Sequence, residues 1–301
     1  MKTVKLHDYE VDIDSLLVER LIAAQFPQWA DLPVKPFQSA GTDNAIYRLG
    51  DDLSVRLPRI PDAAIRLAAE ITWLPKLAPR LPLVIPTPAV KGLPGENYPF
   101  EWAVYQWLDG EAAVAERITD LHQAAADLAH FILALQQVDP AGAPPAGSGR
   151  GVPLASRDAQ TRAAIESLRG MIDINTVTAA WEAILQAPEW DGTPVWIHGD
   201  LQSGNLLAQD GRLSAVIDFG CMGVGDPACD LQVAWNLFSE DTRNLFRAEL
   251  QVDDAMWSRG RGWALSIGLI ALPYYHVTNP ALANIARHAI QEVTADYTRR
   301  A

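Results

Sequence analysis

The segment Ile197–Gly220 contains Asp200, Asn205 and Asp218, whose side-chain oxygens could bind a cation. An amide oxygen together with a carboxylate, with the remaining positions left to water and phosphate oxygens, is the ligand set that Mg²⁺ takes when it arrives with a nucleotide. Asp200 could accept the proton of a hydroxyl group or orient that hydroxyl. The residue types are compatible with phosphoryl transfer, and they leave open the alternative of an ordinary surface hairpin with acids near its ends.

The elements around these residues explain how they could meet. The runs "NLLA" and "SAVIDF" are predicted strands joined by a turn at residues 209–212, and Asp200 follows the apolar run "VWI". In such a hairpin, Asn205 and Asp218 lie at the ends remote from the turn. We therefore expect their side chains to converge on one cation, with Asp200 in the loop that leads to it.

The first hundred or so residues read as an α+β module. We expect a helix that begins after an Asp14 N-cap, buries Leu16, Leu17, Leu21 and Ile22, and ends at Pro27. Two short strands follow, at 45–49 and 53–57, and then a helix within 63–79 whose inner face would include Ile65, Ala69 and Leu74. An apolar strand, "FEWAVYQWL", ends at Asp109-Gly110.

After Gly110 the pattern becomes helical. The run 118–139 is a strong amphipathic helix with a Thr119 or Asp120 cap. Residues 140–153 contain too much glycine and proline for regular structure, so they form a linker or a loop lying over a cleft. The longest apolar stretch, 263–275, is broken by polar and helix-breaking residues and is shorter than the roughly 20 residues that span a bilayer. We interpret it as a buried helix.

The composition excludes several classes of protein. The chain has 301 residues, of which 49% are hydrophobic and 20% charged, as in ordinary soluble proteins. Its net charge of −13 argues against nucleic-acid binding and permits a cationic substrate, although acidity also aids solubility. The N-terminus lacks the pattern of a secretory signal, so we expect a cytoplasmic protein without membrane partners. Cys221 and Cys229 are expected to be small buried side chains.

The motif "HGDLQSGN" followed by "DFG" carries a resemblance to a known family. The first reproduces the D-x-x-x-x-N spacing of the protein-kinase catalytic loop, and the second is the kinase D-F-G. With Gly199 in place of the kinase arginine, the chain resembles the aminoglycoside phosphotransferase family, which includes macrolide kinases. The resemblance implies a two-lobed protein-kinase-like fold of the α+β class. Residues 1–108 would form a small nucleotide-binding lobe with an antiparallel sheet and helices, and residues 109–301 a larger, mostly helical lobe for catalysis and substrate.

The resemblance also implies roles for individual residues. Asp200 would be the catalytic base, and Asn205 and Asp218 would bind Mg²⁺ that bridges the phosphates of ATP or GTP. Arg56 stands where many members have lysine and would grip the inner phosphates, with Arg59 as its rival. Further nucleotide-binding positions are Glu70, which pairs with this base, Ser39 and Thr42 in the phosphate loop, and the Gln106 carbonyl and Leu108 amide in the hinge after the gatekeeper Tyr105.

Other positions would support the site or face the substrate. Asp230 and His198 are expected to hold the catalytic loop rather than to react. Asp226 is expected to cap a helix, with a substrate contact as the alternative. Tyr274 and Tyr275, together with Trp263, could wall a substrate pocket, although a core role is the more common one for such aromatic residues.

The acceptor is the open question of the sequence. The resemblance implies transfer to a small-molecule hydroxyl, most readily that of an aminoglycoside or macrolide antibiotic, with antibiotic resistance as the corresponding role. The family also phosphorylates small metabolites such as choline, homoserine and sugars. A nucleotide-binding pseudokinase without transferase activity is a further alternative, which the arginine at position 56 keeps open and the retained Asp200 opposes.

Overall fold

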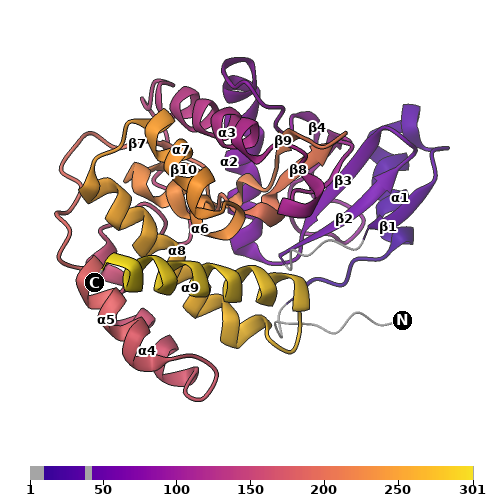
Figure 1. Cartoon of the computed structure of the whole chain (residues 1–301). Coiled ribbons are helices and arrows are strands. Elements are labelled where there is room, and N and C mark those ends of the chain that lie inside the picture. The colour runs from indigo at the N-terminus through magenta and orange to yellow at the C-terminus, as the bar shows by residue number, and fades with distance from the viewer. Residues whose placement is uncertain (1–9, 38–42, 301) are drawn as a thin grey trace. The chain divides into compact units, whose positions relative to one another are not determined.

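The computed structural model describes residues 10–37 and 43–300 (Figure 1). The chain forms two compact units. The first comprises Met1–Pro79 and Ile85–Asp109, and the second comprises Arg80–Val84 and Gly110–Ala301. Residues 80–84 join the second unit because the Val216 N–H donates to the Val84 carbonyl at 2.9 Å. Within the described ranges, no helix is long and apolar enough to cross a membrane.

The first unit is built on a five-stranded antiparallel sheet in the order β1-β2-β3-β5-β4. Its helices α1 and α2 bury apolar side chains, and the sheet alternates buried and partly exposed positions along β2 and β3. The strands are β1 (Val34–Phe37), β2 (Asn44–Leu49), β3 (Leu53–Pro58), β4 (Pro88–Gly92) and β5 (Trp102–Gln106); the helices are α1 (Ser15–Gln25) and α2 (Pro61–Leu77).

The predicted elements of this unit are confirmed, with two errors in the buried faces. Asp14 caps α1 by accepting the Leu17 N–H at 2.8 Å. Leu16, however, is 63% exposed, and Val18 takes its place in the core. In α2, Ile65 is 71% exposed and Ala63, Leu67 and Leu74 are buried. Several overlapping apolar faces are possible in such leucine- and alanine-rich helices, and only the position of the sheet selects one of them.

The second unit is mostly helical, with short strands that carry the site. Its two long C-terminal helices, α8 and α9, pack along one another (Figure 1). The helices are α3 (Leu121–Gln136), α4 (Asp158–Ser167), α5 (Ile174–Ile184), α6 (Val233–Leu237), α7 (Glu240–Leu250), α8 (Asp254–Tyr275) and α9 (Pro280–Arg300). The strands are β6 (Glu111–Ala112), β7 (Val195–Ile197), β8 (Leu206–Gln209), β9 (Arg212–Val216) and β10 (Gly223–Gly225).

Two small sheets position the chemistry. Strand β7 pairs antiparallel with β10, and β8 pairs with β6 on one side and with β9 on the other. The predicted helix after residue 118 is confirmed as α3, capped by Asp120, and the stretch 263–275 lies largely buried in α8. Both cysteines are free thiols, and Cys229 is buried.

Candidate active site

The catalytic loop begins where β7 ends, and a buried carboxylate holds it. Asp230, on the short 3-10 helix Pro227–Gln232, accepts the backbone N–H groups of His198 at 2.7 Å and of Gly199 at 2.8 Å. Gly199 has a φ of 82°, and a Cβ there would lie 2.5 Å from the Cys221 carbonyl oxygen, so glycine is required. Burial raises the pKa of the Asp230 carboxyl, although the two N–H bonds favour its charged form.

His198 links the catalytic loop to the hairpin. Its ring is fully buried and packs against Phe219, with centroids 4.5 Å apart. Nδ1 accepts the Asp200 N–H at 3.2 Å, so the proton lies on Nε2, which donates to the Ile217 carbonyl at 3.0 Å. Both ring nitrogens are therefore engaged with the backbone. This geometry supports a structural role for His198 and leaves Asp200 as the candidate base.

Asp200 and Asn205 are held against each other. The Asn205 Nδ2 group donates to the Asp200 backbone carbonyl at 2.8 Å and to its carboxylate oxygen Oδ2 at 3.0 Å. The Asn205 side chain is buried, at the end of the short 3-10 helix Ser203–Asn205. Because the amide nitrogen is directed at Asp200, the amide oxygen Oδ1 faces away from Asp200 and is the atom suited to a metal.

The hairpin brings Asp218 to the same end as Asn205, as predicted. Leu206 pairs with Val216, and the Ile217 N–H donates to the Asn205 carbonyl at 2.8 Å. Asp218, the next residue, is exposed and adopts the left-handed conformation, with φ 64° and ψ 65°. A non-glycine residue in this region is uncommon and strained, and such residues concentrate at functional sites.

The donor set fits magnesium brought by a nucleotide rather than a metal held by protein alone. In the described part of the chain, no group of three or more His, Cys, Asp or Glu side chains could hold a metal ion. Asn205 and Asp218 offer one amide oxygen and one carboxylate. Mg²⁺ commonly takes one or two protein ligands and completes its octahedron with phosphate oxygens and water.

In the first unit, Arg56 of β3 pairs with Glu70 of α2. The Arg56 Nη1 atom lies 2.6 Å from the Glu70 Oε2 atom, and the two side chains are 15% and 1% exposed. The pairing expected for the helix acid is thus present in the structure. Because Arg56 makes this ion pair, we favour Arg56 over Arg59 as the basic residue that binds the phosphates.

In the hinge segment, residues 106–108, the first two residues direct their backbone polar groups to opposite edges. The Trp107 N–H donates to the Asp52 carbonyl at 2.8 Å, continuing the pairing between β3 and β5. In an extended chain, the polar groups of neighbouring residues point to the opposite edge. The Gln106 carbonyl, at the end of β5, therefore faces away from β3, and the nucleotide contact expected for the Leu108 N–H stays a prediction. Tyr105 is 4% exposed, and burial raises the pKa of its hydroxyl.

Comparison with known proteins adds the family. A model of the phosphotransferase enzyme family matches residues 34–263. The chain belongs to the phosphotransferase enzyme family. The predicted resemblance is confirmed, and so is the predicted fold class, with an antiparallel sheet and helices before a mostly helical part. No curated protein sequence matches this phosphotransferase.

Solved structures of similar fold include antibiotic phosphotransferases. The GDP complex of the F108L mutant of aminoglycoside 2'-phosphotransferase-IIIa has a TM-score of 0.73 at 20% identity, covering 94% of this chain and 98% of that one. ADP-bound APH(2'')-Ib has a TM-score of 0.61 at 16% identity, covering 94% and 98%. Macrolide 2'-phosphotransferase MphH from Brachybacterium faecium has a TM-score of 0.61 at 23% identity, covering 92% and 97%. At these identities the likeness shows the fold.

The remaining predicted positions in this phosphotransferase differ in how far the structure describes them. Ser39 and Thr42 lie outside the described residues. Asp226 is 3% exposed; its carboxylate caps the helix at Pro227 and accepts from Arg259 Nε at 2.8 Å. This arrangement corrects the alternative of a substrate contact, because both carboxylate oxygens are engaged inside the protein. Tyr274 and Tyr275 lie at the end of α8 with their rings edge to face, and their contact with substrate stays a prediction.

Trp263 is fully buried and belongs to the core rather than to a pocket wall. Two other residues near the catalytic loop were not predicted from the sequence. Asn236 Oδ1 accepts the Ser203 N–H at 3.0 Å and so holds the loop between Asp200 and Asn205. Arg150 Nη2 donates to Asp200 Oδ1 at 3.0 Å. The signal for Arg150 was a lone arginine among glycines in the segment 140–153.

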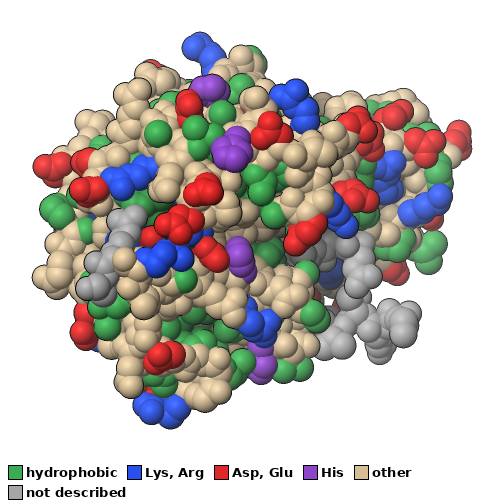
Figure 2. Space-filling model, in the orientation of Figure 1, with side chains coloured by type: hydrophobic (Ala, Val, Ile, Leu, Met, Phe, Trp, Pro, Cys, Tyr) green, Lys and Arg blue, Asp and Glu red, His purple; other side chains and the backbone are tan. Residues whose placement is uncertain are grey.

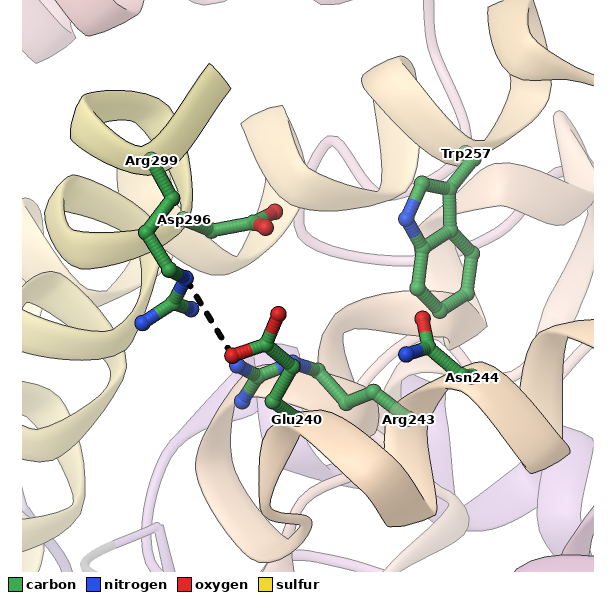
Figure 3. A pocket seen from close by; sticks show the side chains of 6 residues that line it. All are labelled: Glu240, Arg243, Asn244, Trp257, Asp296 and Arg299. Atoms are coloured by element: carbon green, nitrogen blue, oxygen red, sulfur yellow. Dashed lines mark ion pairs between the residues drawn. The ribbon is translucent and has the colours of Figure 1, made fainter.

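A polar pocket of about 130 Å³ lies among α7, α8 and α9, outside the catalytic loop and hairpin (Figure 3). Its charged side chains all take part in ion pairs: Arg299 pairs with Glu240 at 3.3 Å, as the dashed line in Figure 3 marks. Arg243, Asp296 and their partners make further ion pairs. Opposite charges are balanced within the pocket, so we interpret it as an ion-pair network between helices.

Proposed function

We propose that this phosphotransferase moves the γ-phosphoryl group of ATP or GTP to a hydroxyl group of a small molecule, most readily an aminoglycoside or macrolide-type antibiotic. The observation that carries the proposal is the arrangement of Asp200, Asn205 and Asp218 at one end of the hairpin. Asp200 would accept the proton, and Asn205 and Asp218 would supply oxygen ligands to the metal. A protein that only binds nucleotide, as a pseudokinase does, has no need of Asp200.

Each residue has a separate task in the transfer. Asn205 and Asp218 would hold Mg²⁺, which when bound neutralises charge on the phosphate oxygens. Asp200 would accept a hydrogen bond from the acceptor hydroxyl, orient it in line with the γ-phosphorus, and take its proton late in the reaction. Arg56, kept in place by Glu70, would contribute a fixed positive charge for the inner phosphates.

The nucleotide donor is supported by the proteins of similar fold. Two of these structures are complexes with GDP and ADP. In this chain, the Gln106 carbonyl at the end of β5 and the Leu108 N–H would be the hinge groups that meet the nucleotide base. Such groups can bond to adenine or to guanine.

The acceptor class is supported by similarity and by charge. The proteins of similar fold are aminoglycoside and macrolide phosphotransferases, and one was solved with kanamycin. This chain carries a net charge of −13, and acidic side chains are distributed over the face drawn in Figure 2. A negative surface attracts cationic substrates such as aminoglycosides. Small metabolites with a hydroxyl group are the second class to test.

The test is a substrate panel. The purified chain is incubated with Mg-ATP or Mg-GTP and with separate pools of aminoglycosides, macrolides and small alcohols that include choline, homoserine and sugars. We expect one pool to stimulate nucleoside diphosphate release and to gain a phosphate by mass spectrometry, and the Asp200→Ala protein to show neither. Nucleotide binding without stimulation by any pool would instead support the pseudokinase.

A further inference from the structure

The glycine- and proline-rich segment is bonded to the catalytic region along much of its length. We call residues 144–151 the Arg150 loop. Val224 of β10 donates its N–H to the Pro144 carbonyl at 2.9 Å and accepts the Ala146 N–H at 3.1 Å. At the far end of the loop, the Asp226 N–H donates to the Gly151 carbonyl at 2.8 Å. The loop therefore runs beside β10 as an added strand-like segment, rather than serving as a linker.

Close backbone packing fixes the path of the loop. A Cβ on Gly223 would lie 2.5 Å from the Ala146 nitrogen. A Cβ on Gly151 would lie 2.7 Å from Ile197 Cδ1 and 2.9 Å from the Gly225 Cα. Atoms that close leave no space for side chains, so the glycines of loop and strand allow direct contact between the two backbones.

A tight turn then aims Arg150 at the catalytic loop. The Arg150 N–H donates to the Gly147 carbonyl at 3.0 Å, and the two residues between them have φ values of 56° and 63°. The Arg150 Nη2 atom lies 3.0 Å from Asp200 Oδ1, with side chains 15% and 23% exposed. Burial alone would lower the pKa of Arg150, but Asp200 and the nearby thiols raise it on balance, so the guanidinium stays charged.

Asp200 is consequently held by two different segments. Arg150 binds Oδ1, and the Asn205 amide binds Oδ2. Two hydrogen bonds at the two oxygens fix both the position and the plane of a carboxylate. Each oxygen retains a further lone pair that can accept the proton of a hydroxyl group.

The Arg150–Asp200 ion pair is not arranged in the way that would contribute most to the stability of the fold. The Arg150 Nε atom is buried and has no hydrogen-bond partner in the described ranges. An unmet donor of this kind costs free energy, and native proteins keep few of them. Stability alone therefore gives little reason for a guanidinium at this place, whereas its hydrogen bond to Asp200 does.

A second arginine holds the chain just beyond the loop by different contacts. Arg157, on the short helix Leu154–Arg157, donates from Nε to Ser266 Oγ at 3.0 Å, and its guanidinium lies 4.9 Å from the Trp263 ring centroid. Ser266 and Trp263 belong to α8. Arg157 thus provides a matched control, because its loss should loosen the chain that follows the Arg150 loop without removing a bond to Asp200.

We propose that Arg150 is a positioning residue of the phosphoryl transfer: it holds the Asp200 carboxylate in the orientation from which that carboxylate accepts the hydroxyl proton. The inference rests on the proposed function of Asp200 as the base. It gives the glycine- and proline-rich loop a defined purpose, which is to deliver one guanidinium to the catalytic loop.

The first experiment separates kcat from KM. With the acceptor found in the panel, Arg150→Ala should lower kcat about 10²-fold, the size expected when a reacting group is misplaced by about 1 Å. The KM for the Mg-nucleotide should stay within about 3-fold, because the nucleotide ligands are intact. Arg150→Lys keeps a charge but loses the planar fork and should recover part of kcat. Arg157→Ala should lower the melting temperature more than Arg150→Ala does and affect kcat less.

The second experiment tests whether Arg150 acts through Asp200. Guanidinium ion added to Arg150→Ala should restore part of kcat, and it should restore none in Asp200→Ala. In the Asp200→Asn background, the further change Arg150→Ala should lower the residual single-turnover rate by less than about 3-fold, because residues that act as a unit are not additive. Arg169→Ala, an exposed arginine of the same unit, serves as the unaffected reference.

Three outcomes would overturn the inference. They are a kcat for Arg150→Ala within about 3-fold of the parent value, no response of that variant to guanidinium, or a full additional loss in the Asp200→Asn background. If Arg150→Ala does not fold, Arg150→Lys carries the same test through its kcat at unchanged KM. Failure of the proposed function is distinguishable, because the parent protein would then transfer phosphate to no member of the panel.

Discussion

Two arginine–carboxylate pairs, one in each unit, have similar geometry but different origins. Arg56 lies 2.6 Å from Glu70, and Arg150 lies 3.0 Å from Asp200. The first pair joins a strand to the helix that follows it, while the second joins a turn in an irregular loop to a residue that follows a different strand. The first pair could be expected from the resemblance to a family in which a helix acid pairs with the basic residue of the preceding strand. A pair that depends on how a loop packs against β10 could not.

The comparison also separates the tasks of the two arginines. Glu70 is almost wholly buried, so the first pair serves to fix Arg56, which would bind the nucleotide. Asp200 is itself the candidate base, so in the second pair the arginine serves the carboxylate. Mutations in the first pair should therefore act on nucleotide affinity, and mutations at the second on turnover.

The largest effect is expected at Asp200. Asp200→Ala should lower kcat by about 10³-fold or more, because it removes both proton acceptance and orientation of the hydroxyl. Nucleotide affinity, measured by calorimetry, should remain within a few-fold of that of the parent. Near-normal turnover would remove Asp200 from the mechanism, and with it the distinction between the two pairs.

The metal ligand should rank next. Asp218→Ala should lower kcat by about 10²-fold and abolish the dependence of nucleotide affinity on Mg²⁺, because the only carboxylate proposed for the metal is lost. Titration of the nucleotide with and without Mg²⁺ measures this directly. An unchanged affinity for the Mg-nucleotide complex would contradict the role of Asp218.

Arg56 sharpens the comparison with Arg150. Arg56→Ala should raise the KM for the Mg-nucleotide about 10-fold with a smaller change in kcat, the reverse of the pattern expected for Arg150→Ala. Arg56→Lys, which keeps the charge, should lie between the parent and the alanine variant. The two alanine variants are compared by steady-state kinetics under identical conditions. If both change the same constant, the proposed division of tasks is wrong.

The last prediction concerns Cys221, whose reactivity reports on the Arg150–Asp200 region and should have no effect on turnover. Burial, together with Asp200, raises the pKa of its thiol to about 11, while Arg150 opposes the shift. Only the thiolate reacts, so at pH 8 alkylation in the folded protein should be about 10²-fold slower than in a peptide and should rise toward pH 11. Asp200→Asn should speed it, and Arg150→Ala should slow it further. Mass spectrometry of the Cys221 peptide gives the rates, and equal rates in all three proteins would contradict this electrostatic coupling.

Part of the fold and of the site could be predicted because it depends on local patterns. The hairpin 206–216 followed from two apolar runs around a turn, and this register brings Asn205 next to Ile217 and Asp218. The cap at Asp14 and the strands 45–49 and 53–57 followed in the same way. The buried faces of α1 and α2 were partly wrong, because Leu16 and Ile65 satisfy helical spacing but point away from the sheet that defines the core.

By itself, the sequence determined the order Asp200, Asn205, Asp218 and the strands between them, and its resemblance to the family predicted the pairing of Arg56 with Glu70. These features depend on residue type and on spacing along one continuous segment or between successive elements. Only the tertiary structure decided that Asp226 is engaged inside the protein, that Trp263 belongs to the core and that Arg150 reaches Asp200. Each of these contacts joins residues distant in the chain, and such contacts are set by the packing of the whole unit rather than by local preference.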